Sequence, residues 1–297
     1  MDLVRQVCKC GLWACISLIA PSFAAGNQLT DAIQSIRAGD WNKAEAALEQ
    51  TPPDGLPTLY WKSYIRFRTG RYPDAISIIS RYLEQKPESA GGHKILGLSL
   101  FMQGRPAEAE SELKRATELD GSDAEALYYL GRLHFNRSDA PEALRIFEKV
   151  VLIDKTSVRG YNHLGQTLEA LTRFDEAREA YRKAIEIEST QGTKSEWPYF
   201  NLGVLCLKEG RPAEAIELLR EALTRNRNWP EAKTQLAVAL FSTNQYEEAR
   251  TQLAEVLASN PKNADAHYQM GRLLLKLGKP DQARTHFEEF ESLKKRP

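Results

Sequence analysis

The chain has few of the features on which disulfide-rich domains and nucleic-acid binders depend. Only four of its 297 residues are cysteine, and three of them (Cys8, Cys10 and Cys15) lie in the first 15 residues. The one remaining thiol, Cys206, excludes an internal disulfide framework for the rest of the chain. Lys and Arg number 40 and so do Asp and Glu, so the basic excess that usually displaces counterions from nucleic acid is lacking. We expect no nucleic-acid partner.

The first 25 residues have the layout of a secretory signal peptide. Arg5 and Lys9 precede an apolar run over 11–20, and small residues at Ser22 and Ala24 suit a signal peptidase. A permanent membrane anchor is disfavoured because a spanning helix needs about 20 apolar residues, and a lipid-modified Cys15 has almost no apolar stretch before it. We therefore predict a signal peptide over 1–24, no transmembrane span after its cleavage, and export to the periplasm or beyond.

The rest of the sequence is repetitive. Gly-Arg-Pro-Ala-Glu-Ala at 104–109 recurs at 210–215, an offset of 106 residues or three periods of 34 plus four. A shortened unit over 25–55 precedes seven units of 34 residues, with 192–195 inserted between the fourth and the fifth of them. The seven units span 56–89, 90–123, 124–157, 158–191, 196–229, 230–263 and 264–297. Such a period is the signature of stacked repeats.

Side-chain size is fixed at three positions of the unit. Position 8 is small, position 20 is always alanine, and position 24 is apolar and bulky. The residues at position 8 are Ser63, Gly97, Gly131, Gly165, Gly203, Ala237 and Gly271; those at position 24 are Ile79, Leu113, Phe147, Tyr181, Leu219, Leu253 and Phe287. Small residues let two antiparallel helices approach closely, and bulky ones fill the space between neighbouring hairpins.

Turn residues fall between the two helices of a unit. We expect Gly70, Gly104, Gly210 and Gly278 to end first helices in the left-handed conformation. Prolines such as Pro106 stand where second helices would begin, a place where the missing N–H costs nothing.

This pattern resembles the tetratricopeptide repeat (TPR), over nearly the whole chain after the signal peptide. The resemblance implies an all-α fold, a right-handed superhelix (α-solenoid) of about eight helix-turn-helix repeats. It also implies that first helices line a concave groove through positions 2, 5, 9 and 12. The groove residues predicted in this way are Tyr60, Tyr64, Phe67, Lys94, Phe101, Tyr128, Arg132, Phe135, Asn162, Gln166 and Phe200. Aromatic rings beside cations are typical of recognition surfaces, although large side chains can also merely complete the packing.

Residues capable of catalysis or metal binding are isolated. Cys206 stands at position 11, where four other units carry leucine, which favours a small core residue. We interpret His93, His134 and His267 as packing residues between helices, and His163 and His286 have no second His or Cys at metal-ligand spacing. Gly271–Lys279 superficially resembles a phosphate loop but lies along an expected helix instead of after a strand. We expect no enzymatic activity, no cofactor and no metal.

Two functions fit this sequence. The first is a non-enzymatic scaffold or adaptor in the cell envelope that binds a peptide or a helix of a protein partner in the groove. The alternative is a carbohydrate-polymer-binding module of a polysaccharide secretion system, in which aromatic rings stack on sugar faces. The last unit carries Phe290 and Leu293 without a capping helix after it, so we also expect weak self-association through the C-terminal repeat.

Overall fold

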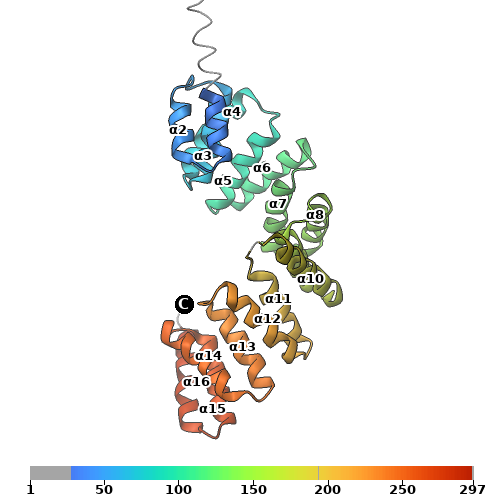
Figure 1. The fold of residues 1–297 in the computed structure, drawn as a ribbon, viewed down its shortest axis with the longest axis vertical. Coiled ribbons are helices and arrows are strands. Elements are labelled where there is room, and N and C mark those ends of the chain that lie inside the picture. The colour runs from blue at the N-terminus through green and yellow to red at the C-terminus, as the bar shows by residue number, and fades with distance from the viewer. Residues whose placement is uncertain (1–27, 193, 296–297) are drawn as a thin grey trace, which may run out of the picture. The chain divides into compact units, whose positions relative to one another are not determined.

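The computed structural model describes residues 28–192 and 194–295 (Figure 1); the predicted signal peptide lies outside these ranges. Every regular element in the described ranges is helical, which confirms the predicted all-α fold. After a helical stretch over 28–37, the helices are α2 (Trp41–Glu49), α3 (Leu56–Arg68), α4 (Tyr72–Gln85), α5 (Ala90–Met102), α6 (Pro106–Leu119), α7 (Ala124–Asn136), α8 (Ala140–Ile153), α9 (Val158–Ala170), α10 (Phe174–Gln191), α11 (Trp197–Lys208), α12 (Pro212–Arg225), α13 (Pro230–Ser242), α14 (Tyr246–Ser259), α15 (Ala264–Lys276) and α16 (Pro280–Lys294). Within the described part of the chain, no helix is both long and apolar enough to cross a membrane.

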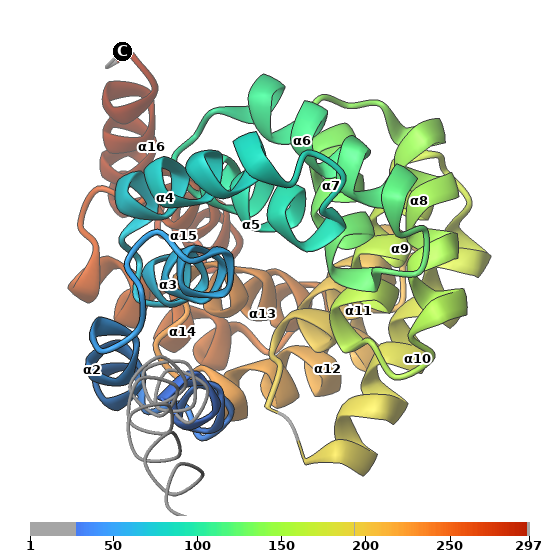
Figure 2. The same cartoon turned by 90° about the horizontal axis from the view of Figure 1, so that it is seen from above.

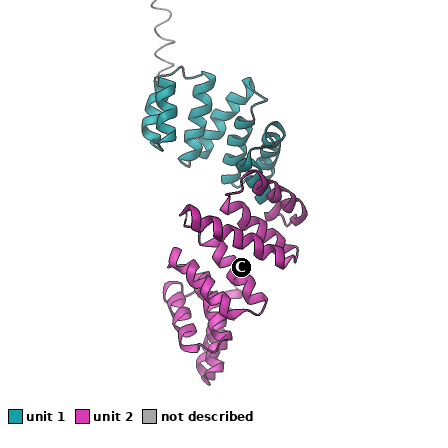
Figure 3. Ribbon diagram, turned by 45° about the vertical axis from the view of Figure 1, so that its right-hand side comes forward, with its two compact units in different colours: residues 1–133 teal, residues 134–297 magenta. Residues whose placement is uncertain are grey.

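The chain forms two compact units, 1–133 and 134–297, with the boundary inside α7 (Figure 3). Within each unit, consecutive helices pack as hairpins, such as α5 with α6 and α11 with α12. The first helices of neighbouring hairpins also touch: α3 touches α5 in unit 1, and α9, α11, α13 and α15 touch in succession in unit 2 (Figure 2). We call the surface formed by these first helices, α7 included, the first-helix layer of each unit.

Each hairpin closes where position 8 meets position 24. A Cβ built on Gly165 would lie 2.5 Å from Cε1 of Tyr181, and one on Gly203 would lie 2.9 Å from Cγ of Leu219. Tyr181 and Leu219 are fully buried. The glycines therefore let the two helices approach until the bulky side chain of the second helix rests on the backbone of the first.

The turns between first and second helices adopt one backbone conformation. Gly70, Gly104, Gly210 and Gly278 have φ of 76, 73, 72 and 71°, which confirms the expected left-handed geometry. Ser138, Thr172 and Asn244 occupy the same place in other repeats, with φ of 62, 59 and 61°. For β-branched Thr172 this conformation is strained, since its Cβ crowds the backbone.

Replacing Thr172 with glycine should therefore stabilise unit 2. We expect a gain of about 1 kcal/mol, because the relief of left-handed strain exceeds the added freedom of glycine in the unfolded chain. Thermal unfolding followed by circular dichroism measures it. The reciprocal variant Gly210→Thr, at the same turn of the next repeat, should lower the free energy of unfolding by about as much. Equal melting temperatures for the two variants would contradict the strain argument.

Adding one methyl group at Gly165 should destabilise unit 2 by about 1–3 kcal/mol, because the Cβ overlaps the ring of Tyr181. The overlap outweighs the gain of about 1 kcal/mol that alanine brings to a helix. The control is the same substitution in a Tyr181→Leu background, which reproduces the Ala237–Leu253 pair found at positions 8 and 24 of another repeat. A double-mutant cycle should show that Gly165→Ala costs less in that background.

Candidate functional site

The predicted residue Tyr64 belongs to an aromatic cluster at the start of unit 1. Its ring lies 5.9 Å from that of Trp61 and 6.5 Å from that of Trp41, both in edge-on contact. The guanidinium of Arg68 lies 5.0 Å from the Trp41 ring, and its Nη1 donates a 2.8 Å hydrogen bond to the hydroxyl of Tyr64. Sequence analysis identified only Tyr64 of this cluster, because Trp41, Trp61 and Arg68 lie outside the positions that line the groove in the family.

Tyr60 and Phe67 are partly buried by their own hairpin. The ring of Tyr60 lies 5.5 Å from that of Tyr82 on α4, and burial raises the pKa of the Tyr60 hydroxyl. The ring of Phe67 lies 6.1 Å from that of Tyr72, at the start of the same helix α4. Both residues therefore contribute to the packing of α3 on α4 as well as to the first-helix layer.

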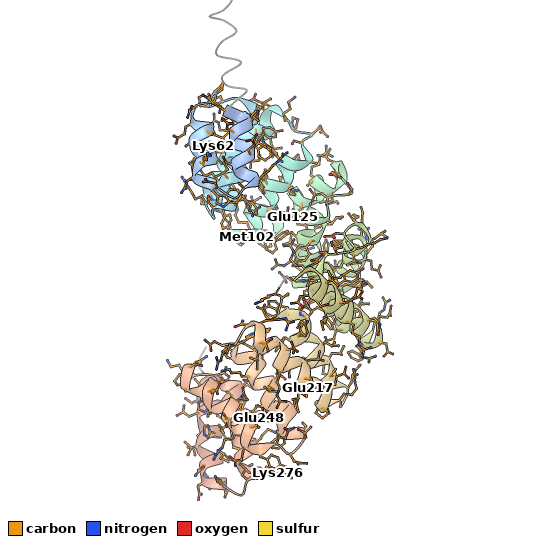
Figure 4. The ribbon with its side chains drawn as sticks, in the orientation of Figure 1. Lys62, Met102, Glu125, Glu217, Glu248 and Lys276 are labelled. Carbon is orange, nitrogen blue, oxygen red and sulfur yellow. The ribbon has the colours of Figure 1, made fainter. Side chains whose placement is uncertain are left out.

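Lys94 is already neutralised within unit 1. Its Nζ lies 2.7 Å from a carboxylate oxygen of Asp123 and 3.6 Å from one of Glu125, whose side chain at the start of α7 is labelled in Figure 4. Burial alone would lower the pKa of Lys94, but the hydrogen bond and the charge of Asp123 outweigh it, and the pKa is raised. The ammonium is therefore a link between α5 and the start of α7.

Phe101, Tyr128 and Arg132, in contrast, are brought together by α5 and α7. The Arg132 guanidinium lies 4.9 Å from the ring centre of Phe101, 5.8 Å from that of Tyr128 and 5.5 Å from that of Tyr129. The rings support one another, with Phe101 and Tyr128 lying 5.2 and 5.3 Å from Tyr129. We call these four residues the Arg132 cradle. In the described ranges no carboxylate forms an ion pair with Arg132.

Unit 2 repeats this arrangement in its first-helix layer. The guanidinium of Arg272 on α15 lies 5.4 Å from the ring of Phe241 and 5.8 Å from that of Tyr268. Arg272 stands at position 9 of its repeat, as Arg132 does, and each aromatic pair comes from position 12 of the preceding repeat and position 5 of the same one. The recurrence shows that the repeat geometry itself places an arginine over two rings.

The four predicted residues of unit 2 are buried or partly buried. Asn162 is 5 % exposed, and its Oδ1 accepts a 2.9 Å hydrogen bond from Nδ2 of Asn201. Phe135 lies edge-on to His163 at 6.4 Å, Phe200 lies 4.5 Å from Trp229, and Gln166 is partly buried. Asn162 thus joins α9 to α11 and presents little surface.

Hollows in the described surface lie elsewhere. One of about 800 Å³ lies on unit 2 over α15 and α16, where Leu275, Phe287 and Lys295 line it. Another, of about 470 Å³, is lined by Tyr161, Leu164 and other residues of α8 to α10. The predicted groove residues line neither hollow; in the Arg132 cradle, Tyr128 is 5 % exposed and the other three residues are partly buried.

Reactive side chains are buried or paired. Cys206 is fully buried, and burial raises the pKa of its thiol to about 11, so the reactive thiolate is scarce at neutral pH. In the part of the chain that the structure describes, no three His, Cys, Asp or Glu side chains gather as metal ligands.

One buried ionic cluster was not anticipated from the sequence. Glu188, 4 % exposed at the end of the long helix α10, accepts hydrogen bonds from Arg225 Nε at 3.1 Å and from the Tyr199 hydroxyl at 2.9 Å. Burial raises the pKa of Glu188, but these donors outweigh it and the pKa is lowered; burial together with Glu188 raises the pKa of Tyr199 to about 12. The cluster ties α10 to α11 and α12 beside the inserted residues, and only the folded chain brings its members together.

Known proteins share this organisation. Four family profiles, each described as tetratricopeptide repeat, match residues 20–90 and 95–157, 156–228, 207–262 and 253–285. The type IV pilus assembly protein PilF of Pseudomonas aeruginosa is 27 % identical over 157 residues, covering 52 % of this chain and 61 % of PilF, so the chain matches less than two thirds of that relative.

Solved structures show the same fold. The structure of P. aeruginosa pilF has a TM-score of 0.61 at 24 % identity, with coverage of 70 % of this chain and 93 % of that one. YrrB, described as a TPR protein with an unusual peptide-binding site, has a TM-score of 0.51 at 23 % identity, with coverage of 61 % and 91 %. Matching profiles, hairpin stacking and left-handed turns agree, and the chain belongs to the tetratricopeptide-repeat family.

Proposed function

We propose that the chain is a protein-interaction scaffold whose unit 1 binds an acidic peptide segment at the Arg132 cradle. Tetratricopeptide-repeat proteins are generally protein-interaction scaffolds. The observation that carries the proposal is the guanidinium of Arg132, which lies on three rings and has no carboxylate partner among the described residues.

The chemistry of this arrangement favours a carboxylate. The rings of Phe101, Tyr128 and Tyr129 lie 4.9, 5.8 and 5.5 Å from the guanidinium and restrict its movement, so less side-chain entropy is lost when a ligand binds its N–H groups. A guanidinium edge matches a carboxylate with two parallel charge-assisted hydrogen bonds. The rings around it provide apolar contact for neighbouring side chains of the same ligand. An Asp, a Glu or a C-terminal carboxylate flanked by apolar residues meets all three requirements.

Lys94, one repeat earlier, already has a carboxylate partner. Its ion pair with Asp123 satisfies the ammonium within unit 1, and a ligand carboxylate would have to displace that partner. We therefore assign carboxylate recognition to Arg132, and give Lys94 the role of positioning α7.

We place this activity in the cell envelope. The layout of residues 1–24 supports export to the periplasm or beyond, and the similarity to a type IV pilus assembly protein suits an envelope setting. The exposed side chain of Leu275 beside the hollow over α15 and α16 supports weak self-association through the C-terminal repeat.

The carbohydrate alternative rests on a different feature. Trp197 in unit 2 is 48 % exposed and lies 4.7 Å from Trp229, and an exposed indole can stack on a sugar ring. This surface is separate in sequence from the Arg132 cradle, so the two functions can be tested independently.

Replacing Arg132 with alanine should abolish selection of acidic peptides. We expect a displayed library of random peptides, selected on the purified protein, to be enriched in Asp or Glu next to apolar residues. Arg132→Ala should weaken the best peptide by roughly 10- to 100-fold, the value of a charge-assisted hydrogen-bonded pair, as measured by fluorescence anisotropy.

The matched control is Arg105→Ala in the same unit, since Arg105 pairs with Glu108 at the start of α6 and lies outside the first-helix layer. It should leave peptide affinity unchanged. Enrichment without acidic residues, or equal losses for both variants, would contradict the proposed site. If no peptide is enriched, and the protein is retained on an immobilised polysaccharide while the Trp197→Ala variant is not, the carbohydrate module would be favoured.

A further inference from the structure

Two histidines in the last hairpin face each other through the same ring nitrogen. Nδ1 of His267 on α15 lies 3.0 Å from Nδ1 of His286 on α16, and the ring centres are 5.1 Å apart. Nε2 of His267 lies 3.0 Å from the carbonyl oxygen of Pro261. Because a carbonyl oxygen only accepts, Nε2 carries the hydrogen, and the neutral ring of His267 has its lone pair on Nδ1, directed at His286.

The second repeat contains the same arrangement with a different partner. Nε2 of His93 lies 2.8 Å from the carbonyl oxygen of Pro87, and its Nδ1 lies 2.6 Å from a carboxylate oxygen of Glu112. In both repeats the proline precedes the histidine by six residues and the partner follows it by 19. The carboxylate of Glu112 thus takes the place in this repeat that the imidazole of His286 takes in the last one.

From this geometry we propose that His267 and His286 together chelate a divalent transition-metal ion such as Cu²⁺ or Zn²⁺. Two nitrogens bound to one ion at about 2.0–2.1 Å lie about 3 Å apart in adjacent coordination positions, which is the separation the two Nδ1 atoms already have. Binding the ion would replace the hydrogen bond between the two Nδ1 atoms, with both rings turned so that their lone pairs meet at the ion. Water would complete the coordination, since no third protein ligand is gathered here among the described residues.

The surroundings of the pair support metal binding. Metal-ligating histidines usually donate their other N–H to a carbonyl or carboxylate, which fixes the ring; Pro261 provides this contact for His267. His267 is 9 % exposed, so its ring is held in place by packing. Without a metal, Nδ1 of His286 donates the hydrogen bond to Nδ1 of His267; when an ion binds, His286 would carry its hydrogen on Nε2 instead.

The test is a titration of the full chain with Zn²⁺ and Cu²⁺ followed by calorimetry, with Cys8, Cys10 and Cys15 replaced by serine because thiols also bind these ions. We expect one ion per chain, bound more tightly for Cu²⁺ than for Zn²⁺. His286→Gln should weaken binding at least tenfold. The matched control His93→Gln, which removes the corresponding histidine of the second repeat, should leave both stoichiometry and affinity unchanged.

A second measurement does not depend on how the variants fold. In the chain that keeps both histidines, ¹⁵N NMR of the imidazole rings should show Zn²⁺ shifting Nδ1 of His267 and of His286 together, while the His93 signals stay in place. If Zn²⁺ leaves both Nδ1 signals unmoved, or if His93→Gln and His286→Gln weaken binding equally, the pair only forms a hydrogen bond and the metal site is refuted.

Discussion

The close approach of the two helices in each hairpin is the constraint on which the rest of the structure depends. Where position 8 is glycine, the bulky side chain at position 24 rests on the first helix, as Tyr181 does on Gly165. This contact buries the large side chains that a single hairpin could not otherwise cover. On the first-helix layer of unit 1, the rings of Phe101 on α5 and Tyr129 on α7 lie 5.2 Å apart. The helix that carries Phe101 of the Arg132 cradle makes the same close approach, at Gly97 and Leu113.

Arginines before second helices and arginines in the first-helix layer have different partners. At the start of second helices they pair with a carboxylate three residues on, as Arg105 does with Glu108 and Arg173 with Glu176. Such exposed pairs add little stability, but they leave no free cation there. In the first-helix layer, Arg132 and Arg272 lie on aromatic rings instead. Rings hold a guanidinium without neutralising it, so the layer keeps a positive charge available for a partner.

The fold could be predicted because it depends on residue size and turn chemistry, which are written locally in the chain. Glycine at Gly104 and proline at Pro106 mark a turn whatever surrounds them. The candidate site could be predicted only in part. Tyr128 and Lys94 were both predicted to line the groove because they stand at position 5, but only the folded chain shows that Asp123 neutralises Lys94. A position in a repeat specifies where a side chain points, whereas its partner comes from the neighbouring repeat. Tyr129 and Arg225 were missed for the same reason.

The His93 and His267 sites show that side chains outside the packing positions can vary between repeats. Both histidines keep the same bond to a proline carbonyl, so the backbone around them is equivalent. What differs is one side chain on the facing helix, Glu112 or His286, and that difference exchanges a carboxylate partner for a second imidazole nitrogen. Because packing is secured at positions 8 and 24, chemistry at positions 4 and 23 can change without loss of the hairpin. A repeat solenoid can therefore gain a binding site in one unit while its neighbours remain purely structural.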